Sequence, residues 1–312
     1  MTTLVEIAKR AGVSKSTASN VVRGHCVVAE ATRRRVEQAI AELHYHPNAI
    51  ARSLKSRTSS VLGIVVPDLA NPFYAGLAVS VERAAKELHF AVLALNTECL
   101  AASENDAGRV FIERRVEGVI IGGISVGSPL PKRLLDHDIR VVLASLGEPD
   151  DERLSVIDHD DSAAMEAAVD HLYALGHRRF TFAAQDFAEQ SGERRKLGFE
   201  QALARRKLAP VAFDAATAII AHNDLHAIAV IDQLEQSGLT VPQDVSVIGH
   251  DDIPIASHSR IQLSTIRSDA VQMGRRAVDL LVGSAREGRR VGRRELQENP
   301  LIIRSTTARV RP

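Results

Sequence analysis

Apolar residues at helical spacing open the chain and predict a short first helix. They recur at intervals of three and four residues, at Leu4, Ile7, Ala8 and Ala11. Thr3 and Glu6 form a capping box just ahead of that face. Gly12 permits a tight turn, and Ser14 stands where it would cap a second helix over residues 15 to about 22. The chain is therefore expected to begin with two helices joined by a turn.

The expected second helix has an apolar face and a hydrogen-bonding face. Ala18, Val21 and Val22 share the apolar side, which would pack inward. The opposite side carries short or forked hydrogen-bonding groups, namely Lys15, Ser16, Thr17, Ser19, Asn20 and Arg23. Such a face fits the DNA major groove, where base edges and phosphates both need donors. The alternative is an ordinary three-helix unit with a solvated polar face.

A third helix is predicted over residues 32–43. It would turn Val36, Ile40 and Leu43 inward and the arginines at 33–35 outward. Residues 1–60 hold ten Lys and Arg against four Asp and Glu, a net charge of +6, so the rest of the chain carries a net charge of −6. A basic head on an acidic body favours contact between the head and a polyanion.

The segment after the third helix has two interpretations. Residues 48–55, NAIARSLK, are compatible with a helix but too few to be stable alone in water. Residues 57–60, RTSS, read as an exposed joint before the apolar run that follows. The segment is either a plain linker or a piece that folds on a partner.

From Val61 onward, apolar runs alternate with amphipathic helices, which is typical of parallel β-sheets. The expected strands are 61–66, 91–96, 118–123, 141–145, 154–159, 179–184, 217–222 and 244–249. The expected helices include 76–88, 103–115, 191–206 and 224–237. Two such series predict an α/β body of two lobes with doubly wound parallel sheets, and ligands in such folds bind beyond the carboxyl ends of the strands.

Composition excludes several classes of protein. The two cysteines, Cys26 and Cys99, are far apart, which argues against a disulfide framework and fits a reducing cytoplasm. The start has no apolar core of signal-peptide length, and no run approaches the length of a membrane span. The twelve histidines show no metal-ligand spacing, and no Walker loop, GxSxG elbow or GxGxxG turn is present. We expect no catalytic residues, no metal, no cofactor and no membrane partner.

Four motifs in order resemble the lactose/galactose repressor family of bacterial transcription factors. They are the AGVS turn (11–14), the TASNVV helix (17–22), ATRRRVEQAIAEL (31–43) and YHPNAIARSL (45–54). The resemblance continues through the body, for example in VPDLANPFY (66–74) and VPQDVSVIGHDD (241–252). It implies a helix-turn-helix domain (1–46), a hinge helix and linker (47–60), and an effector-binding and dimerisation domain of periplasmic-binding-protein type (61–312). The first lobe would span about 61–159 and 269–292, and the second about 160–268 and 293–312.

The resemblance implies a homodimer on a pseudo-palindromic operator in double-stranded DNA. Lys15, Ser16 and Asn20 would read bases, while Thr3, Thr17, Ser19, Arg23 and Thr32 would hold phosphates. Residues of the third helix end and hinge would add contacts, namely Tyr45, Asn48, Ala51 and Leu54. In the family, a leucine at the position of Leu54 wedges into the central minor-groove step.

The resemblance also implies a small effector between the lobes. Phe73 and Tyr74 match stacking positions, Arg195 matches an arginine that forks onto ligand hydroxyls, and Asn223 and Asp251 match polar groups at strand ends. Ser145 replaces a common aspartate. About thirty residues that members carry after Leu208 are missing, which would remove a strand and a helix, leave an exposed strand edge and open one wall of the pocket. Phe73 could instead be core, and Asn223 and Asp251 could simply cap the segments after them.

Three functions compete. A ligand-responsive repressor accounts for the head, the hinge and the body together, and its effector would be a sugar or sugar derivative, with a purine as the alternative. A repressor with a disabled sensor lobe is a variant of the same idea. A sugar-binding transport protein conflicts with the basic head and the missing signal peptide, and an enzyme lacks a catalytic constellation. We expect the cytoplasmic repressor.

Overall fold

The computed structural model describes residues 2–22, 28–45, 59–145, 147, 151–184, 190–286 and 292–311. They divide into two compact units, Met1–Ser59 and Ser60–Pro312. The cysteine at position 26 lies outside the described residues, and Cys99 is half-buried. No helix of the described chain is long and apolar enough to span a membrane.

The N-terminal unit is built from the three helices that the sequence predicts. They are α1 (Leu4–Ala11), α2 (Lys15–Val22) and α3 (Glu30–Glu42), the last beginning two residues earlier than expected. Their buried core consists of Ile7, Ala8, Ala11, Ala18, Val36 and Ala39. Val21 is only partly buried against this core. The apolar positions thus pack inward and leave the polar face of α2 toward solvent.

Local chemistry sets the turn between α1 and α2. The capping box forms as expected, because Thr3 caps the N–H of Glu6 and the Glu6 carboxylate accepts the N–H of Thr3 over 2.7 Å. Gly12 ends α1 in the left-handed region with φ of 63°, where glycine pays no steric cost. The Ser14 hydroxyl accepts the N–H of Thr17 over 3.1 Å and so caps α2.

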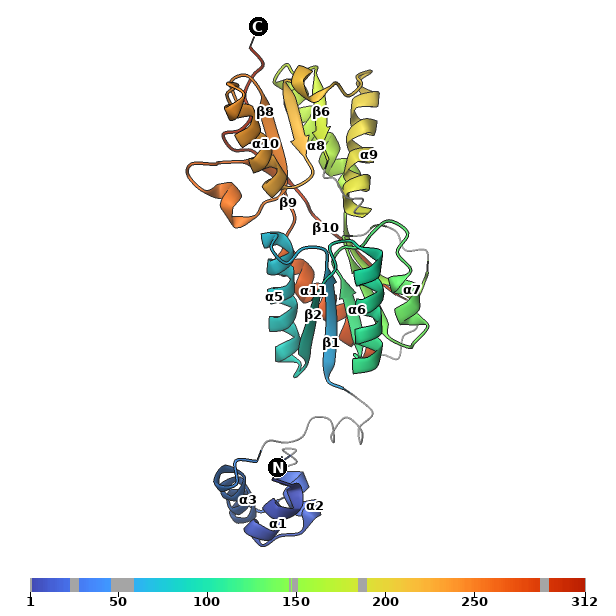
Figure 1. Ribbon diagram of the computed structural model, residues 1–312, viewed down its shortest axis with the longest axis vertical. Helices are drawn as coiled ribbons and strands as arrows, with labels where there is room; N and C mark the ends of the chain where they lie inside the picture. The colour runs from blue at the N-terminus through green and yellow to red at the C-terminus, as the bar shows by residue number, and fades with distance from the viewer. Residues whose placement is uncertain are drawn as a thin grey trace. The chain divides into compact units, whose positions relative to one another are not determined.

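The first lobe of the body is a doubly wound parallel sheet with the strand order β10-β5-β4-β3-β1-β2 among the described residues. The strands are β1 (Val61–Val66), β2 (Ala91–Asn96), β3 (Gly118–Ile121), β4 (Arg140–Ala144), β5 (Ser155–His159) and β10 (Arg294–Gln297). Its helices are α5 (Pro72–Glu87), α6 (Ala101–Arg114), α7 (Leu130–Leu135) and α11 (Ala270–Arg286). Figure 1 shows α5 and α11 together on one face and α6 and α7 on the other.

The second lobe has the order β11-β9-β8-β7-β6 among the described residues. Its strands are β6 (Phe180–Ala183), β7 (Ala218–Ala221), β8 (Ser246–Asp251), β9 (Ser264–Arg267) and β11 (Leu301–Ile302). Its helices are α8 (Asp161–Ala174), α9 (Gln190–Arg205) and α10 (Asp224–Gln236), with short 3-10 turns at Phe213–Ala215 and Pro254–Ser257.

Three strands differ from the expected parallel lobes. β10 pairs with β5 in the first sheet, although we expected all of residues 293–312 in the second lobe. β11 pairs antiparallel with β9, so the second sheet is not wholly parallel. β9 itself lies outside the expected strands, because Ile266 is its only large apolar residue. β10 lies at a sheet edge and alternates exposed and half-buried residues. The sequence pattern therefore gave little signal for any of the three.

The shortened connection in the second lobe leaves a continuous sheet with β6 at its edge. After α9 ends at Arg205, the described chain reaches β7 through the turn at Phe213–Ala215 and forms no other strand or helix on the way. Val211 donates its N–H to the Phe180 carbonyl over 2.8 Å, on the side of β6 away from β7. The short connection thus covers part of the edge that the missing unit would expose.

Candidate nucleic-acid interface and ligand crevice

The polar face of α2 is the candidate DNA-reading surface. Lys15, Ser16 and Asn20 are exposed, whereas Thr17 and Ser19 are half-buried. The Ser14 hydroxyl lies 2.7 Å from the Ser16 hydroxyl and 2.8 Å from the Thr17 hydroxyl. The cap that begins α2 therefore also orients two of the side chains expected to contact DNA.

The remaining expected DNA contacts are spread over the unit or lie outside the described residues. Thr3 is exposed, but its hydroxyl is engaged with Glu6. Thr32 is half-buried in the first turn of α3, and Tyr45 packs partly against the core of the unit. Four expected contacts fall outside the described part of the chain: Arg23, Asn48, Ala51 and Leu54. Their roles stay predictions.

The body brings most of the expected effector residues to the ends of strands that face the junction between the lobes. Asp251 ends β8, Asn223 follows β7 and Ser145 follows β4, while Arg195 comes from α9. All six expected residues, Phe73, Tyr74, Ser145, Arg195, Asn223 and Asp251, are buried. The strand-end rule thus gathers groups that are far apart in sequence.

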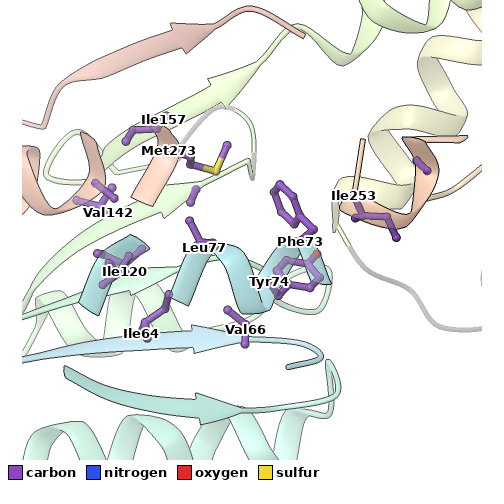
Figure 2. Packing of buried hydrophobic residues seen from close by; sticks show 14 of the residues in the cluster. Ile64, Val66, Phe73, Tyr74, Leu77, Ile120, Val142, Ile157, Ile253 and Met273 are labelled. Atoms are coloured by element: carbon purple, nitrogen blue, oxygen red, sulfur yellow. The ribbon is translucent and has the colours of Figure 1, made fainter. Parts of the chain in front are cut away.

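Phe73 and Tyr74 begin α5 and lie in a hydrophobic cluster that also includes Ile253 from the second lobe, as Figure 2 shows. Their rings meet edge to face with centroids 5.2 Å apart. A ligand stacked on either ring would replace contacts of this cluster. The stacking role stays a prediction beside the alternative that Phe73 is core.

Arg195 is the centre of the polar part of the junction. Its guanidinium donates to the His222 carbonyl over 2.8 Å and to Asp251 Oδ1 over 3.5 Å. Its Nε lies 3.9 Å from Asp161 Oδ1. Because the side chain is 5% exposed, its charge needs such partners to remain buried. The arginine therefore holds two carboxylates of the second lobe and its strand ends together.

Asn223 and Ser145 have structural contacts of their own. The Asn223 amide oxygen accepts the N–H of His226 over 2.8 Å and caps α10. Ser145 adopts a positive φ of 64° and lies with its hydroxyl 3.4 Å from His159 Nδ1. The capping alternative for Asn223 is thus realised, and its contact with an effector stays a prediction.

Sequence reasoning missed three polar residues of this junction: His159, Asp161 and His250. His250 is fully buried, and its Nδ1 lies 3.0 Å from Asp251 Oδ1 while its Nε2 lies 3.9 Å from Asp161 Oδ1. Burial above all, with repulsion from Arg195, holds the pKa of His250 well below its usual range. Burial also raises the pKa of Asp161, against the pull of Arg195 and Arg194. The sequence signals were two runs of polar residues that end apolar strands, VIDHDD (156–161) for His159 and Asp161 and VIGHDD (247–252) for His250.

Buried polar atoms with no hydrogen-bond partner gather at the same junction. Among the described residues they include His159 Nε2, Asp161 Oδ1 and Oδ2, Ser191 Oγ, His250 Nε2 and Ser268 Oγ. Each such atom costs about 1–3 kcal/mol of lost solvation, and folded proteins contain few of them. Their concentration at the strand ends is what a binding crevice requires.

A second arginine ties the two lobes together beside the crevice. Arg194, on α9, forks onto Asp158 of β5 with contacts of 2.9 and 3.1 Å and donates to the His159 carbonyl over 3.2 Å. It also lies 3.2 Å from Asp161 Oδ2. Asp158 is 1% exposed on its side chain, so this bidentate pair is largely desolvated.

A cavity of about 270 Å³ lies beside Arg194. It is lined by His159, Asp160, Asp161, Ser162, Arg194, Leu197, Gly198, Gln201, Arg294 and Leu296. None of the six expected effector residues lines it. Within the described residues, no group of three or more His, Cys, Asp or Glu side chains could hold a metal ion.

Comparison with known families covers both units. The family "Bacterial regulatory proteins, lacI family" matches residues 3–48. "Periplasmic binding proteins and sugar binding domain of LacI family" matches residues 59–214, and "Periplasmic binding protein-like domain" matches 169–307.

Curated relatives match nearly end to end. An HTH-type transcriptional repressor PurR of Photobacterium profundum is 30% identical over 335 aligned residues, covering 98% of this chain and 98% of the relative. A PurR of Aliivibrio fischeri is 31% identical and covers 90% of this chain and 91% of the relative.

Solved structures agree. The Lac repressor dimer bound to operator and the anti-inducer ONPF superposes with a TM-score of 0.84 at 26% identity, over 98% of this chain and 99% of that chain. A CelR–cellobiose complex reaches a TM-score of 0.71 at 27% identity, over 98% of this chain and 100% of that chain.

Acid should destabilise the body through its buried histidines. Burial, reinforced by repulsion from Arg195, lowers the pKa of His159 to about 4. The unfolded chain takes up this proton near pH 6.5, so the contribution of His159 to stability is complete above pH 6.5 and is lost as the pH falls toward 4. Urea unfolding measures the free energy of unfolding at each pH. Between pH 6 and pH 5 this free energy should fall less steeply in His159→Gln than in the wild type, by about 1 kcal/mol per pH unit. The same slope in both proteins would contradict this assignment.

Proposed function

The chain belongs to the lacI family of bacterial regulatory proteins, and from this premise we propose that it is a sequence-specific transcriptional repressor controlled by a small effector. The observation that carries the proposal is a capped helix-turn-helix, with an exposed polar face on α2, joined in one chain to a two-lobed body that buries polar side chains at its strand ends. The protein acts on DNA rather than as an enzyme. A repressor must meet its operator, so it works in the cytoplasm.

α2 is the recognition helix in this proposal. Lys15 donates to guanine O6 or N7, and Asn20 pairs with adenine N6 and N7 in the major groove. Ser16 makes a third base contact, while Thr3, Thr17, Ser19, Arg23 and Thr32 hold phosphates. Exposure of Lys15, Ser16 and Asn20 supports this division, because base readers must reach into the groove.

Asn20→Ala tests the readout of bases. The variant should lose preference at one base position, with a cost of about 1–3 kcal/mol there, because the bidentate contact to adenine is gone. Operator selection from a random library, followed by binding titrations, measures this preference. The matched control is Glu37→Ala on the exposed side of α3, which should keep the selected sequence. An Asn20→Ala variant that weakens all sequences equally would assign Asn20 to the phosphates instead.

The segment at residues 47–60 acts as a hinge helix on the operator, with Asn48, Ala51 and Leu54 toward the DNA. Leu54→Ser should therefore weaken specific operator binding by at least tenfold and leave nonspecific binding within about threefold, because only the specific complex uses the minor-groove wedge. Titrations of operator and random DNA at one salt concentration give both numbers. If Leu54→Ser lost the same affinity for operator and for random DNA, the hinge proposal would be wrong and the segment would be a plain linker.

The repressor acts as a homodimer, because one helix-turn-helix reads only a few base pairs and two-fold symmetry doubles the interface. The structure of the Lac repressor dimer on its operator supports this arrangement by analogy. Sedimentation velocity at micromolar concentration should yield a dimer of twice 33.8 kDa. A monomer both alone and with operator would refute it.

The effector is a sugar or sugar derivative in this proposal, and a purine is the alternative. The CelR–cellobiose complex supports a sugar. The names of the PurR relatives do not state a sugar ligand, so a purine stays the alternative. Phe73, Tyr74, Ser145, Arg195, Asn223 and Asp251 are its expected contacts. A ligand that binds one lobe arrangement better than the other would alter operator affinity. A disabled sensor would respond to no ligand at all.

A further inference from the structure

We propose that the crevice selects an uncharged ligand that donates hydrogen bonds to His250 and Asp161, and rejects the phosphorylated form of the same ligand. This inference rests on the proposed function, because it concerns the effector of that repressor. It adds two residues, His250 and Asp161, which are not among the expected contacts. The shared chemistry is a set of neighbouring hydroxyl or N–H donors, as sugars and nucleobases both provide.

The orientation of His250 determines which atom it offers to a ligand. Its Nδ1 lies 3.0 Å from a carboxylate oxygen of Asp251. Since a carboxylate only accepts hydrogen bonds, Nδ1 carries the proton and donates it. The ring is fully buried and stays neutral next to Arg195. Its Nε2 is therefore an acceptor, and it has no hydrogen-bond partner.

Asp161 adds two more acceptors beside that atom. Its Oδ1 lies 3.9 Å from His250 Nε2, too far for a direct hydrogen bond but close enough for one ligand group to contact both. Neither Asp161 oxygen has a hydrogen-bond partner, although Arg194 pairs with the group at 3.2 Å. Three buried acceptor atoms thus lie close together between β8 and the start of α8. A ligand that supplies donors satisfies them, and one that supplies only acceptors does not.

The charges around these atoms disfavour an anion. Arg195 is already shared between Asp251 at 3.5 Å and Asp161 at 3.9 Å. Arg194 is shared between Asp158 at 2.9 Å and Asp161 at 3.2 Å. Arg294 lies 3.8 Å from the other oxygen of Asp158. Three arginines and three buried carboxylates are therefore already paired with one another, and the histidines His159 and His250 are held neutral by burial. A phosphate brought to this site would have to compete with these carboxylates for the arginines, and would be repelled by them in a medium that screens charge poorly.

The test uses the full-length protein and matched pairs of ligands. Isothermal titration calorimetry compares D-glucose with glucose 6-phosphate, D-ribose with ribose 5-phosphate, cellobiose with cellobiose phosphate, and guanosine and inosine with their 5′-monophosphates. We expect at least one neutral member to bind and its phosphorylated partner to bind at least tenfold more weakly. The sugar pairs and the purine pairs show which of the two ligand classes supplies the hydrogen-bond donors. Tighter binding of a phosphorylated member, or binding by no neutral member, overturns the proposal.

Two variants and one matched control assign the selectivity to the named residues. Asp161→Asn should narrow the ratio of neutral to phosphorylated affinity by about tenfold, because it removes one buried negative charge. Asp160→Asn is the control, since it makes the same charge change at the exposed neighbouring position and asparagine also caps helices well. His250→Phe should weaken the neutral ligand about tenfold, as expected for one lost buried hydrogen bond, and leave the phosphorylated form unchanged. Equal weakening of both forms in His250→Phe contradicts a recognition role.

Operator titrations on the same preparations separate this inference from the proposed function. A neutral ligand that binds with the expected selectivity but leaves operator affinity unchanged would refute effector control and support the crevice chemistry. A protein that selects no operator sequence refutes the repressor proposal, whatever the calorimetry shows. A phosphorylated ligand that binds tightly and changes operator affinity upholds the repressor and overturns the neutral-ligand selection.

Discussion

The buried pairing of two adjacent arginines with carboxylates is the constraint on which the body depends. Arg194 forks onto Asp158 of the first lobe, and Arg195 holds Asp161 and Asp251 of the second. Removing one member of such a set leaves an uncompensated buried charge, which typically costs about 3–5 kcal/mol. Because both arginines lie in the first half of α9, this helix determines where the strand ends of the second lobe meet β5 of the first.

The junction also differs from a packed hydrophobic core, which supports the proposed ligand site. A hydrophobic junction would leave no polar atom without a partner, whereas this one buries several around His250 and Asp161. Such atoms lower stability unless a ligand satisfies them. Stability is thus reduced at the place where the family places its effector. The hydrophobic cluster around Phe73 and Ile253 lies beside it and supplies the apolar side of the same junction.

Much of the fold follows from local sequence patterns. The capping residues Thr3 and Ser14 and the left-handed turn at Gly12 lie where the sequence predicts them. Apolar runs locate β1 and β2 to the residue, and most other core strands to within two residues at each end. The failures are β9, β10 and β11, which carry no apolar run long enough to be recognised. They are strands because they pair with neighbouring strands in the folded protein, and not because of their own sequence pattern.

The candidate site divides in the same way. Sequence alone determined the polar face of α2, because a helical period of 3.6 residues suffices to separate it from the buried face. The family resemblance also placed Asn223 and Asp251 at strand ends. Only the tertiary structure decided that His250 lies fully buried between Asp251 and Asp161. Residues 161 and 250 are 89 positions apart, and their approach depends on the packing of α8, α9 and β8. No local pattern encodes such a contact, since the position of each side chain depends on how the elements pack around it.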